Sequence, residues 1–321
     1  MIVINSTITT VGPLSIAMPV PEGGRENAWG KFPVMARGVD QDGNLQMTGY
    51  LPATTLRGFL RREAVLRDME AAAAADKHYN LKRAYSELIG QDADSEKSGE
   101  DIDLLAIKKA RDESPVLDLF GSGLGIKSRL SVSNFLPAMN VLPQPVSGVR
   151  KDLDDTEGAL ELIEAGDQQR FYGRSDANSA RARAATVVST LDKKIRAAKK
   201  NAGEDAAELE IERAAAQALV EKYELEMGEM KNSSRTVLTW WTLPAGLTLN
   251  GRLVVDRDRP RDIELLMRGL DALSRHPVLG AHSARGCGEI SGTFDFLRDG
   301  ALQKRVTVGD FMPAQIVDFG N

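Results

Sequence analysis

Two long alanine-rich segments of opposite charge constrain the fold of this chain more than any other feature. From Gln168 to Lys200 the sequence carries nine basic residues against two acidic ones, a net charge of +7. From Glu204 to Glu229 it carries nine acidic residues against two basic ones, a net charge of -7. Alanine and long charged side chains favour helix, and Asn201-Ala202-Gly203 between the segments is typical of a turn. We therefore expect a helical hairpin with one basic and one acidic helix.

The simplest explanation of this charge pattern is that the two helices pair with each other. Such pairing accounts for most of the positive charge of residues 193–200. It accounts less well for Arg170, Arg174, Arg181 and Arg183, which lie beyond the obvious partners in the acidic helix. Those arginines are therefore candidates for contact with a ligand.

The rest of the chain alternates strand patterns with shorter helical patterns. Strands are expected at 1–17 with a break at 12–13, at 31–36 and 45–50, after 121–128, on both sides of 244–246 and after 288. Helices are expected from about residue 54, around 81–89 and at 261–275. This order fits an α+β fold with a split βαβ, ferredoxin-like core that carries helical insertions. We expect palm segments at 1–60, 119–150 and 235–321, a helical insertion at 61–118 and a hairpin insertion at 151–234.

Composition excludes several classes of protein. The 321 residues are 42% hydrophobic and 27% charged, with a net charge of -5 and a pI near 5.5, which argues mildly against a generic nucleic-acid binder. One cysteine and three histidines predict no internal disulfide and no dedicated zinc site. Cys287 lies between two glycines, with His282 five residues earlier, and a tight turn explains it better than a catalytic pair. The sequence predicts a soluble cytoplasmic protein without a membrane segment, a metal or a cofactor.

Three segments combine backbone donors with isolated basic residues. GYLPATTLRGFLRR (49–62) offers hydroxyl groups, a helix N-terminus capped by Thr54 or Thr55, and arginines. GSGLGIKSRL (121–130) resembles a nucleotide-triphosphate loop, but its lysine is one position out of place and a strand follows it, so we reject that reading. HSARGCG (282–288) offers glycines, a serine and an arginine. Each segment alone is most simply a tight turn.

Together the three segments and the basic helix predict a track for the phosphates of a polyanion, because backbone amides, hydroxyls and guanidinium groups all suit phosphate oxygens. The residues expected to contact it are Thr54, Thr55, Arg57, Arg61, Lys127, Arg129, Arg170, Arg174, Arg181, Ser283, Arg285 and Gly286.

These segments resemble motifs of the CRISPR backbone subunits of the RAMP superfamily, the Cas-seven type that polymerises along guide RNA. Its motif P-G-S-S-L-K-G-x-x-R is similar to Pro52 through Arg61, with Ala53 in place of glycine. Its L-F-G is similar to Leu119, Phe120 and Gly121, and its L-G-x-x-x-S-R-G-Y-G is similar to residues 279–288, where Ala284 and Cys287 depart from the serine and the aromatic residue. The resemblance covers both ends of the chain and leaves the middle unmatched. The charged hairpin favours a divergent branch, and type IV is the best fit.

The resemblance implies an RRM-like palm, a thumb insertion, and a subunit that binds guide RNA (crRNA) as several copies. The implied partners are crRNA, a target nucleic acid (most simply DNA), other copies of the chain and other CRISPR effector subunits. Type III relatives cut target RNA with an aspartate that falls at about Lys31 here, and a lysine cannot replace that carboxylate. We therefore expect a binder without cleavage activity. A target-cleaving ribonuclease that uses Glu26 or Asp40 is the alternative.

Overall fold

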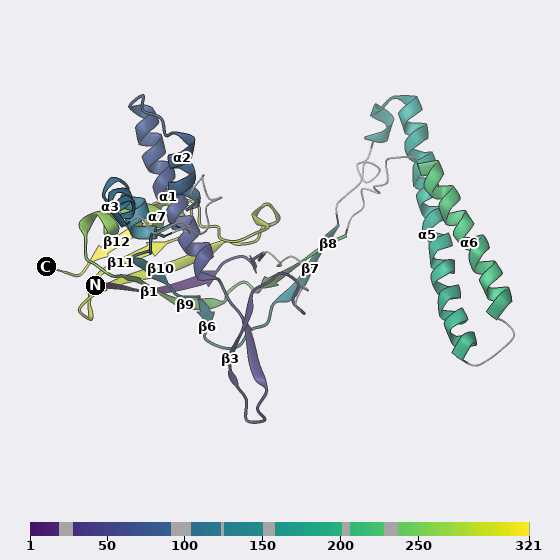
Figure 1. The fold of residues 1–321 in the computed structure, drawn as a ribbon, viewed down its shortest axis with the longest axis horizontal. Coiled ribbons are helices and arrows are strands. Elements are labelled where there is room, and N and C mark those ends of the chain that lie inside the picture. The colour runs from purple at the N-terminus through teal and green to yellow at the C-terminus, as the bar shows by residue number, and fades with distance from the viewer. Residues whose placement is uncertain are drawn as a thin grey trace. The chain divides into compact units, whose positions relative to one another are not determined.

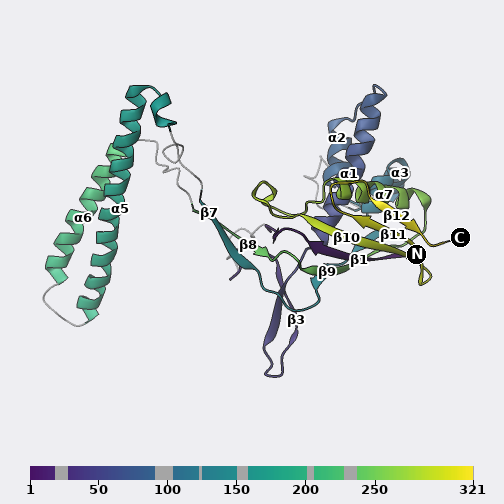
Figure 2. The same cartoon turned by 180° about the vertical axis from the view of Figure 1, so that it is seen from behind.

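A computed structural model describes residues 1–18, 28–90, 104–122, 125–149, 158–200, 206–227 and 237–320 (Figures 1 and 2). The chain divides into two compact units. The core unit comprises Met1–Val146 and Trp240–Asn321, and the second unit comprises Ser147–Thr239.

The core unit is built on an antiparallel sheet with strand order β12-β11-β10-β1-β9-β5, and β6 also pairs with β9. Its strands are β1 (Ile2–Thr10), β5 (Leu130–Val132), β6 (Leu136–Pro137), β9 (Thr248–Val255), β10 (Ile290–Arg298), β11 (Ala301–Val308) and β12 (Gln315–Asp318). Two helices, α1 (Ala53–Ala74) and α7 (Pro260–Arg275), pack against it. Along the chain the order β1-α1-β5-β9-α7-β10 gives the spatial order β10-β1-β9-β5. That arrangement is the ferredoxin-like split βαβ, and it confirms the expected α+β fold.

The remaining described elements of the core unit extend this frame. They are β2 (Leu14–Ser15), β3 (Val34–Val39), β4 (Leu45–Gly49), α2 (Leu81–Ala84), the π-helix η1 (Tyr85–Ile89), α3 (Leu104–Glu113), α4 (Pro115–Phe120) and the 3-10 turn η4 (Ser283–Arg285). Strands β3 and β4 form a hairpin, whereas β2, β8 (Val237–Leu243) and β7 (Gln144–Val149) form a separate three-stranded sheet. The sequence predicted two strands around 244–246, and they do form, but β8 and β9 belong to different sheets.

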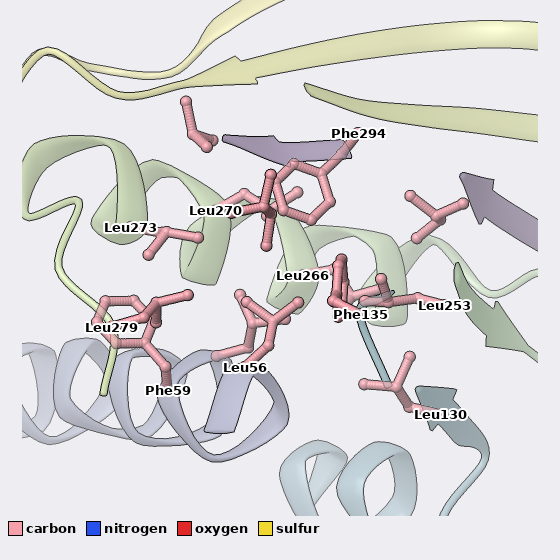
Figure 3. Close-up of a cluster of buried hydrophobic side chains, with 14 of the residues drawn as sticks. Leu56, Phe59, Leu130, Phe135, Leu253, Leu266, Leu270, Leu273, Leu279 and Phe294 are labelled. Carbon is pink, nitrogen blue, oxygen red and sulfur yellow. The ribbon is translucent and has the colours of Figure 1, made fainter. Parts of the chain in front are cut away.

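The core lies between the sheet and the two helices (Figure 3). Leu56, Phe59 and Leu60 of α1 are buried, as their helical spacing predicts. Helix α7 comes so close to α1 that a Cβ on Gly269 would lie 2.9 Å from Cδ2 of Leu60. Since Ala64 is also in this core, the expected boundary between palm and insertion at residues 60 and 61 falls inside α1 and is wrong.

The second unit contains the expected helical hairpin, which we call the arm: α5 (Ala165–Lys200) and α6 (Ala206–Met227). The two helices lie side by side and run in opposite directions (Figures 1 and 2). A 3-10 turn, η3 (Leu160–Leu162), precedes α5. No helix in the described part of the chain combines the length and the apolar character that crossing a bilayer requires.

Candidate nucleic-acid interface

The N-terminus of α1 is capped differently from the sequence prediction. The helix begins at Ala53 with Pro52 as the N-cap residue, so neither Thr54 nor Thr55 caps it. The Ala53 N–H donates instead to Oδ1 of Asn134 at 3.0 Å, a contact between residues distant in sequence that no local pattern reveals. The exposed Thr54 hydroxyl has no hydrogen bond within the described residues, so it remains available to a ligand.

Arg57 is half-buried and its guanidinium donates to the carbonyl of Phe120. Burial lowers the pKa of Arg57, and that carbonyl ends α4, just before the glycine-rich loop 121–128. Arg57 therefore joins α1 to that loop. It is not the free cation that the sequence predicted.

Arg61 is buried, and its role as a ligand contact is wrong. Its Nε donates to the carbonyl of Glu87 at 2.5 Å and its Nη2 to the carbonyl of Ser86 at 2.7 Å. Burial, together with the nearby charge of Arg57, lowers the pKa of Arg61 to about 10. Gly90 follows the π-helix with φ +81, and a Cβ there would lie 2.3 Å from Arg61 Nη1. Arg61 thus holds the π-helix against α1.

Arg129 is also buried and does not face a ligand. It bonds Asp118 through Nε at 3.1 Å and Nη2 at 2.7 Å, and Asp262 through Nη1 at 2.7 Å and Nη2 at 2.8 Å. Burial would raise the pKa of Asp118, but hydrogen bonds from Arg129, Arg111 and Arg261 outweigh burial and lower it. These bonds join α4, α7 and the residue that directly precedes β5. In the same loop Lys127 is exposed, as expected of a ligand contact.

The glycine-rich segment 279–288 is fixed by its backbone. The Ala281 N–H donates to the Ser15 carbonyl at 2.7 Å, and the Gly288 N–H donates to the Pro13 carbonyl at 2.9 Å. Gly280 has φ +92, and a Cβ there would lie 2.2 Å from the Ser15 oxygen, so only glycine fits. Cys287 is buried, which agrees with the tight-turn interpretation. Within this anchored loop, Ser283, Arg285 and Gly286 are exposed to solvent.

Arg285 is the exposed cation best organised for a ligand in the core unit. Its Nη1 lies 2.7 Å from Nδ1 of His282, and its guanidinium carbon lies 5.2 Å from the ring centre of Trp240. The rings of His282 and Trp240 are 5.4 Å apart with an interplanar angle of 31°. Burial lowers the pKa of His282, and the charge of Arg285 lowers it further, so the neutral ring accepts from the guanidinium.

Sequence reasoning missed both aromatic partners of Arg285. Trp240 comes from β8, whereas His282, in the left-handed region at φ +61, comes from the loop itself. The adjacent tryptophans Trp240 and Trp241 in a predicted strand are the sequence signal that could have identified Trp240, because successive side chains of a strand point to opposite faces. Aromatic faces beside an arginine suit nucleobases and phosphates together.

A polar hollow of about 590 Å³ lies over β1, β9 and the segment after β5. Its lining includes Asn5, Thr7, Asn250 and the exposed Arg252, together with Asn134, which caps α1. Strand β1 alternates, so Ile4 and Ile8 face the helices while Asn5 and Thr7 face away from them. No sequence pattern predicted this hollow, because its walls come from segments that only the sheet order brings together.

The predicted arginines of the arm are exposed or half-buried, and each has a local contact. Arg170 pairs with Asp167 at 3.2 Å and Arg181 pairs with Glu224 at 3.2 Å. The guanidinium carbon of Arg174 lies 5.8 Å from the ring centre of Phe171. They belong to a different compact unit from the loops above.

Of the carboxylates proposed for the ribonuclease alternative, Asp40 has a structural role and Glu26 lies outside the described residues. Asp40 Oδ1 accepts from the N–H of Asp42 at 2.9 Å and of Asn44 at 2.8 Å, which closes the β3–β4 turn. The backbone hydrogen bond from Asn44 is the largest influence that lowers the pKa of Asp40. The structure therefore explains Asp40 without catalysis.

Helix α1 is linked to both glycine-rich loops. Arg57 reaches the carbonyl that precedes loop 121–128, and Phe59 belongs to the same buried cluster as Leu279, the first residue of the other loop (Figure 3). Segments from the two ends of the chain are thus joined through one helix of the core unit.

No protein-family model and no curated protein matches the chain. Among solved structures, one match is a chain described as "Type IV-B CRISPR Complex", with 16% sequence identity and a TM-score of 0.43. The match covers 91% of this chain and 90% of that chain. Identity and TM-score are both too low to assign a fold or a function from it.

Proposed function

We propose that this chain is a backbone subunit of a CRISPR effector ribonucleoprotein of type IV. In this role it binds guide RNA, lines up with further copies along that RNA and assembles with other effector subunits to meet a target nucleic acid. It performs no cleavage itself. The proposal rests on the residues of the core unit and on their resemblance to the RAMP motifs.

The single observation that carries the proposal is the organised guanidinium of Arg285. It is exposed, lies over Trp240, is held by His282, and sits in the loop that resembles the S-R-G motif. A guanidinium fixed against an aromatic face retains free N–H groups for a phosphate and loses little side-chain entropy on binding. The exposed residues Thr54, Lys127 and Ser283 add further contacts to the RNA. The buried Arg61 and Arg129 are not part of the proposed ligand set.

The test is binding of fluorescently labelled single-stranded RNA, measured by anisotropy over a range of salt concentrations. Arg285→Ala removes one charge-assisted contact, so we expect about a fivefold to tenfold loss of affinity. The slope of log K against log salt should fall by about 0.7. Arg67→Ala, at an exposed arginine of α1, is the matched control and should change neither quantity appreciably. Unchanged affinity and slope for Arg285→Ala would refute the proposed site.

Assembly and cleavage are tested separately. Sedimentation with RNAs of increasing length should give a number of bound chains that rises with length. Incubation of the assembly with labelled complementary RNA and Mg²⁺ should leave that RNA intact. Regularly spaced cleavage products would instead support the ribonuclease alternative.

A further inference from the structure

The two helices of the arm meet along a narrow seam in which alanine makes up half of the buried residues. The buried residues of the seam are Ala177, Ala184, Leu191 and Ile195 of α5 and Ala216 and Val220 of α6. Alanine buries little apolar surface, so this seam stabilises an isolated pair of helices only weakly. At the same time Val187 is 49% exposed and Leu219 is 46% exposed. The arm therefore has unused apolar surface beside a small core.

Ion pairs close one flank of this seam. Arg181 pairs with Glu224 at 3.2 Å, and Arg213 pairs with Asp192 at 2.5 Å. Residues 181 and 192 are three helical turns apart, as are 213 and 224, so both pairs lie on the same flank. They also fix the antiparallel register of α5 against α6.

The other flank carries a regular stripe on each helix. On α5, Arg183, Val187, Thr190 and Lys194 follow the spacing i, i+4, i+7, i+11 of one helical face, and all four are exposed. On α6 the same spacing joins the exposed residues Glu208, Glu212, Ala215 and Leu219. Stripe residues directly precede seam residues in the sequence, as Thr190 precedes Leu191. Asp192 directly follows Leu191 and therefore lies on the opposite flank. No ion pair crosses the hairpin on this flank within the described residues.

The register places the two stripes at matching levels. Val187 is level with Leu219, Thr190 with Ala215, and Lys194 with Glu212, since the pairs 181–224 and 192–213 set the alignment. Small and apolar residues thus occupy the middle of this face. Basic residues border it on α5 and acidic residues border it on α6. We call it the striped face.

We propose that the striped face docks against the striped face of a second copy of this chain, with the two arms parallel. A twofold axis along the arms then sets α5 of one copy over α6 of the other. Val187 faces the partner's Leu219, and Lys194 faces the partner's Glu212, and each contact occurs twice. The product is a four-helix bundle whose centre buries the apolar residues that one arm leaves exposed.

Charge favours a second copy over RNA as the occupant. Among the described residues, the charges of the striped face are of both signs and make no ion pair, and a phosphate chain on α5 would lie beside Glu208 and Glu212 of α6. A second copy turned by the twofold axis instead presents acidic residues to basic ones. The expected attraction is modest, because exposed ion pairs contribute little. This inference is independent of the proposed function and would stand for a chain that binds no RNA.

The test is site-specific disulfide formation between two differently tagged full-length chains. One carries Val187→Cys and the other Leu219→Cys, and the native Cys287 is buried and stays in place. We expect a mixed dimer several-fold above the dimer from either chain alone. The matched control uses Thr186→Cys, because Thr186 is exposed but does not belong to the stripe. Mixed with the Leu219→Cys chain, it should give little disulfide-linked dimer. Equal yields from positions 186 and 187 would overturn the proposal.

A charge exchange tests the same arrangement and distinguishes docking of a second copy from binding of RNA to α5. Lys194→Glu in the Val187→Cys chain should lower the mixed product by about fivefold, the ratio expected for loss of a favourable exposed pair. Glu212→Lys in the Leu219→Cys chain should restore it. A loss that Glu212→Lys does not restore would contradict the docking and would indicate a polyanion on α5.

Discussion

Replacing Arg129 by methionine tests whether this arginine binds a ligand or holds the fold. Both oxygens of Asp262 receive hydrogen bonds from Arg129, at 2.7 and 2.8 Å, and Asp262 is fully buried. Asp118 would keep Arg111, Arg259 and Arg261 as partners. Arg129→Met therefore leaves one buried carboxylate, that of Asp262, without its partner.

Removing one partner of a buried ion pair costs about 3–5 kcal/mol, because the remaining charge is neither solvated nor paired. For a unit of this size, 1 kcal/mol corresponds to roughly 2–4 °C in Tm, so the expected decrease is about 6–20 °C. The double variant Arg129→Met/Asp262→Leu removes both charges and should recover most of this loss. Its helix still loses an acidic residue from the first turn of α7, worth at most about 1 kcal/mol.

Thermal and urea unfolding, followed by circular dichroism, measure the stability of both variants. RNA binding is then measured at a temperature where each variant is folded, and we expect the affinity of the wild type within about twofold. If Arg129→Met keeps its stability and loses RNA affinity, the buried role of Arg129 is refuted and the original sequence prediction is restored.

Two further predictions concern the loop 279–288. The pKa of His282 should lie below the ordinary value of about 6.5, and Arg285→Ala should raise it, because burial remains but the neighbouring charge is lost; NMR titration of the ring protons measures both. Only neutral His282 can accept the hydrogen bond from Arg285. This contact is therefore fully formed above pH 6.5, and it is lost as the pH falls through the lowered pKa of His282. Gly280→Ala should destabilise the core unit by about 1–3 kcal/mol, since its Cβ would lie 2.2 Å from the Ser15 oxygen. Gly43 has a similar positive φ, but a Cβ there would have no atom within 4 Å, so Gly43→Ala is the control. In urea unfolding we expect Gly43→Ala to lose less stability than Gly280→Ala, and equal losses of stability would contradict the steric argument.

Local patterns predicted the elements and their order well. Apolar spacing located α1 and α7, alternation located β1 and β10, and charge together with alanine content located the hairpin. These patterns succeed because helix and strand periodicity are properties of short segments. The α+β class and the ferredoxin-like order followed from the sequence of elements alone.

The candidate site was predicted less well, because a charged side chain looks the same in sequence whether it is buried or exposed. Arg129 directly follows one glycine-rich loop and Arg285 lies within the other, yet Arg129 meets Asp262 from α7 and Arg285 meets Trp240 from β8. Only the packing of distant segments decides which guanidinium forms an ion pair with a buried carboxylate and which stays exposed.

The hairpin shows the same division between sequence and tertiary structure. Its opposite charges predicted that the two helices pair with each other. In the structure, however, only half of the buried seam residues are alanine, and two ion pairs close one flank. Within the described part of the arm, Lys193, Lys194 and Arg196 make no ion pair. The amino-acid sequence by itself determined which segments are helices, which are strands and how charge is distributed among them. The tertiary structure decided which charges are neutralised, because neutralisation depends on the register and on the depth of burial that packing imposes.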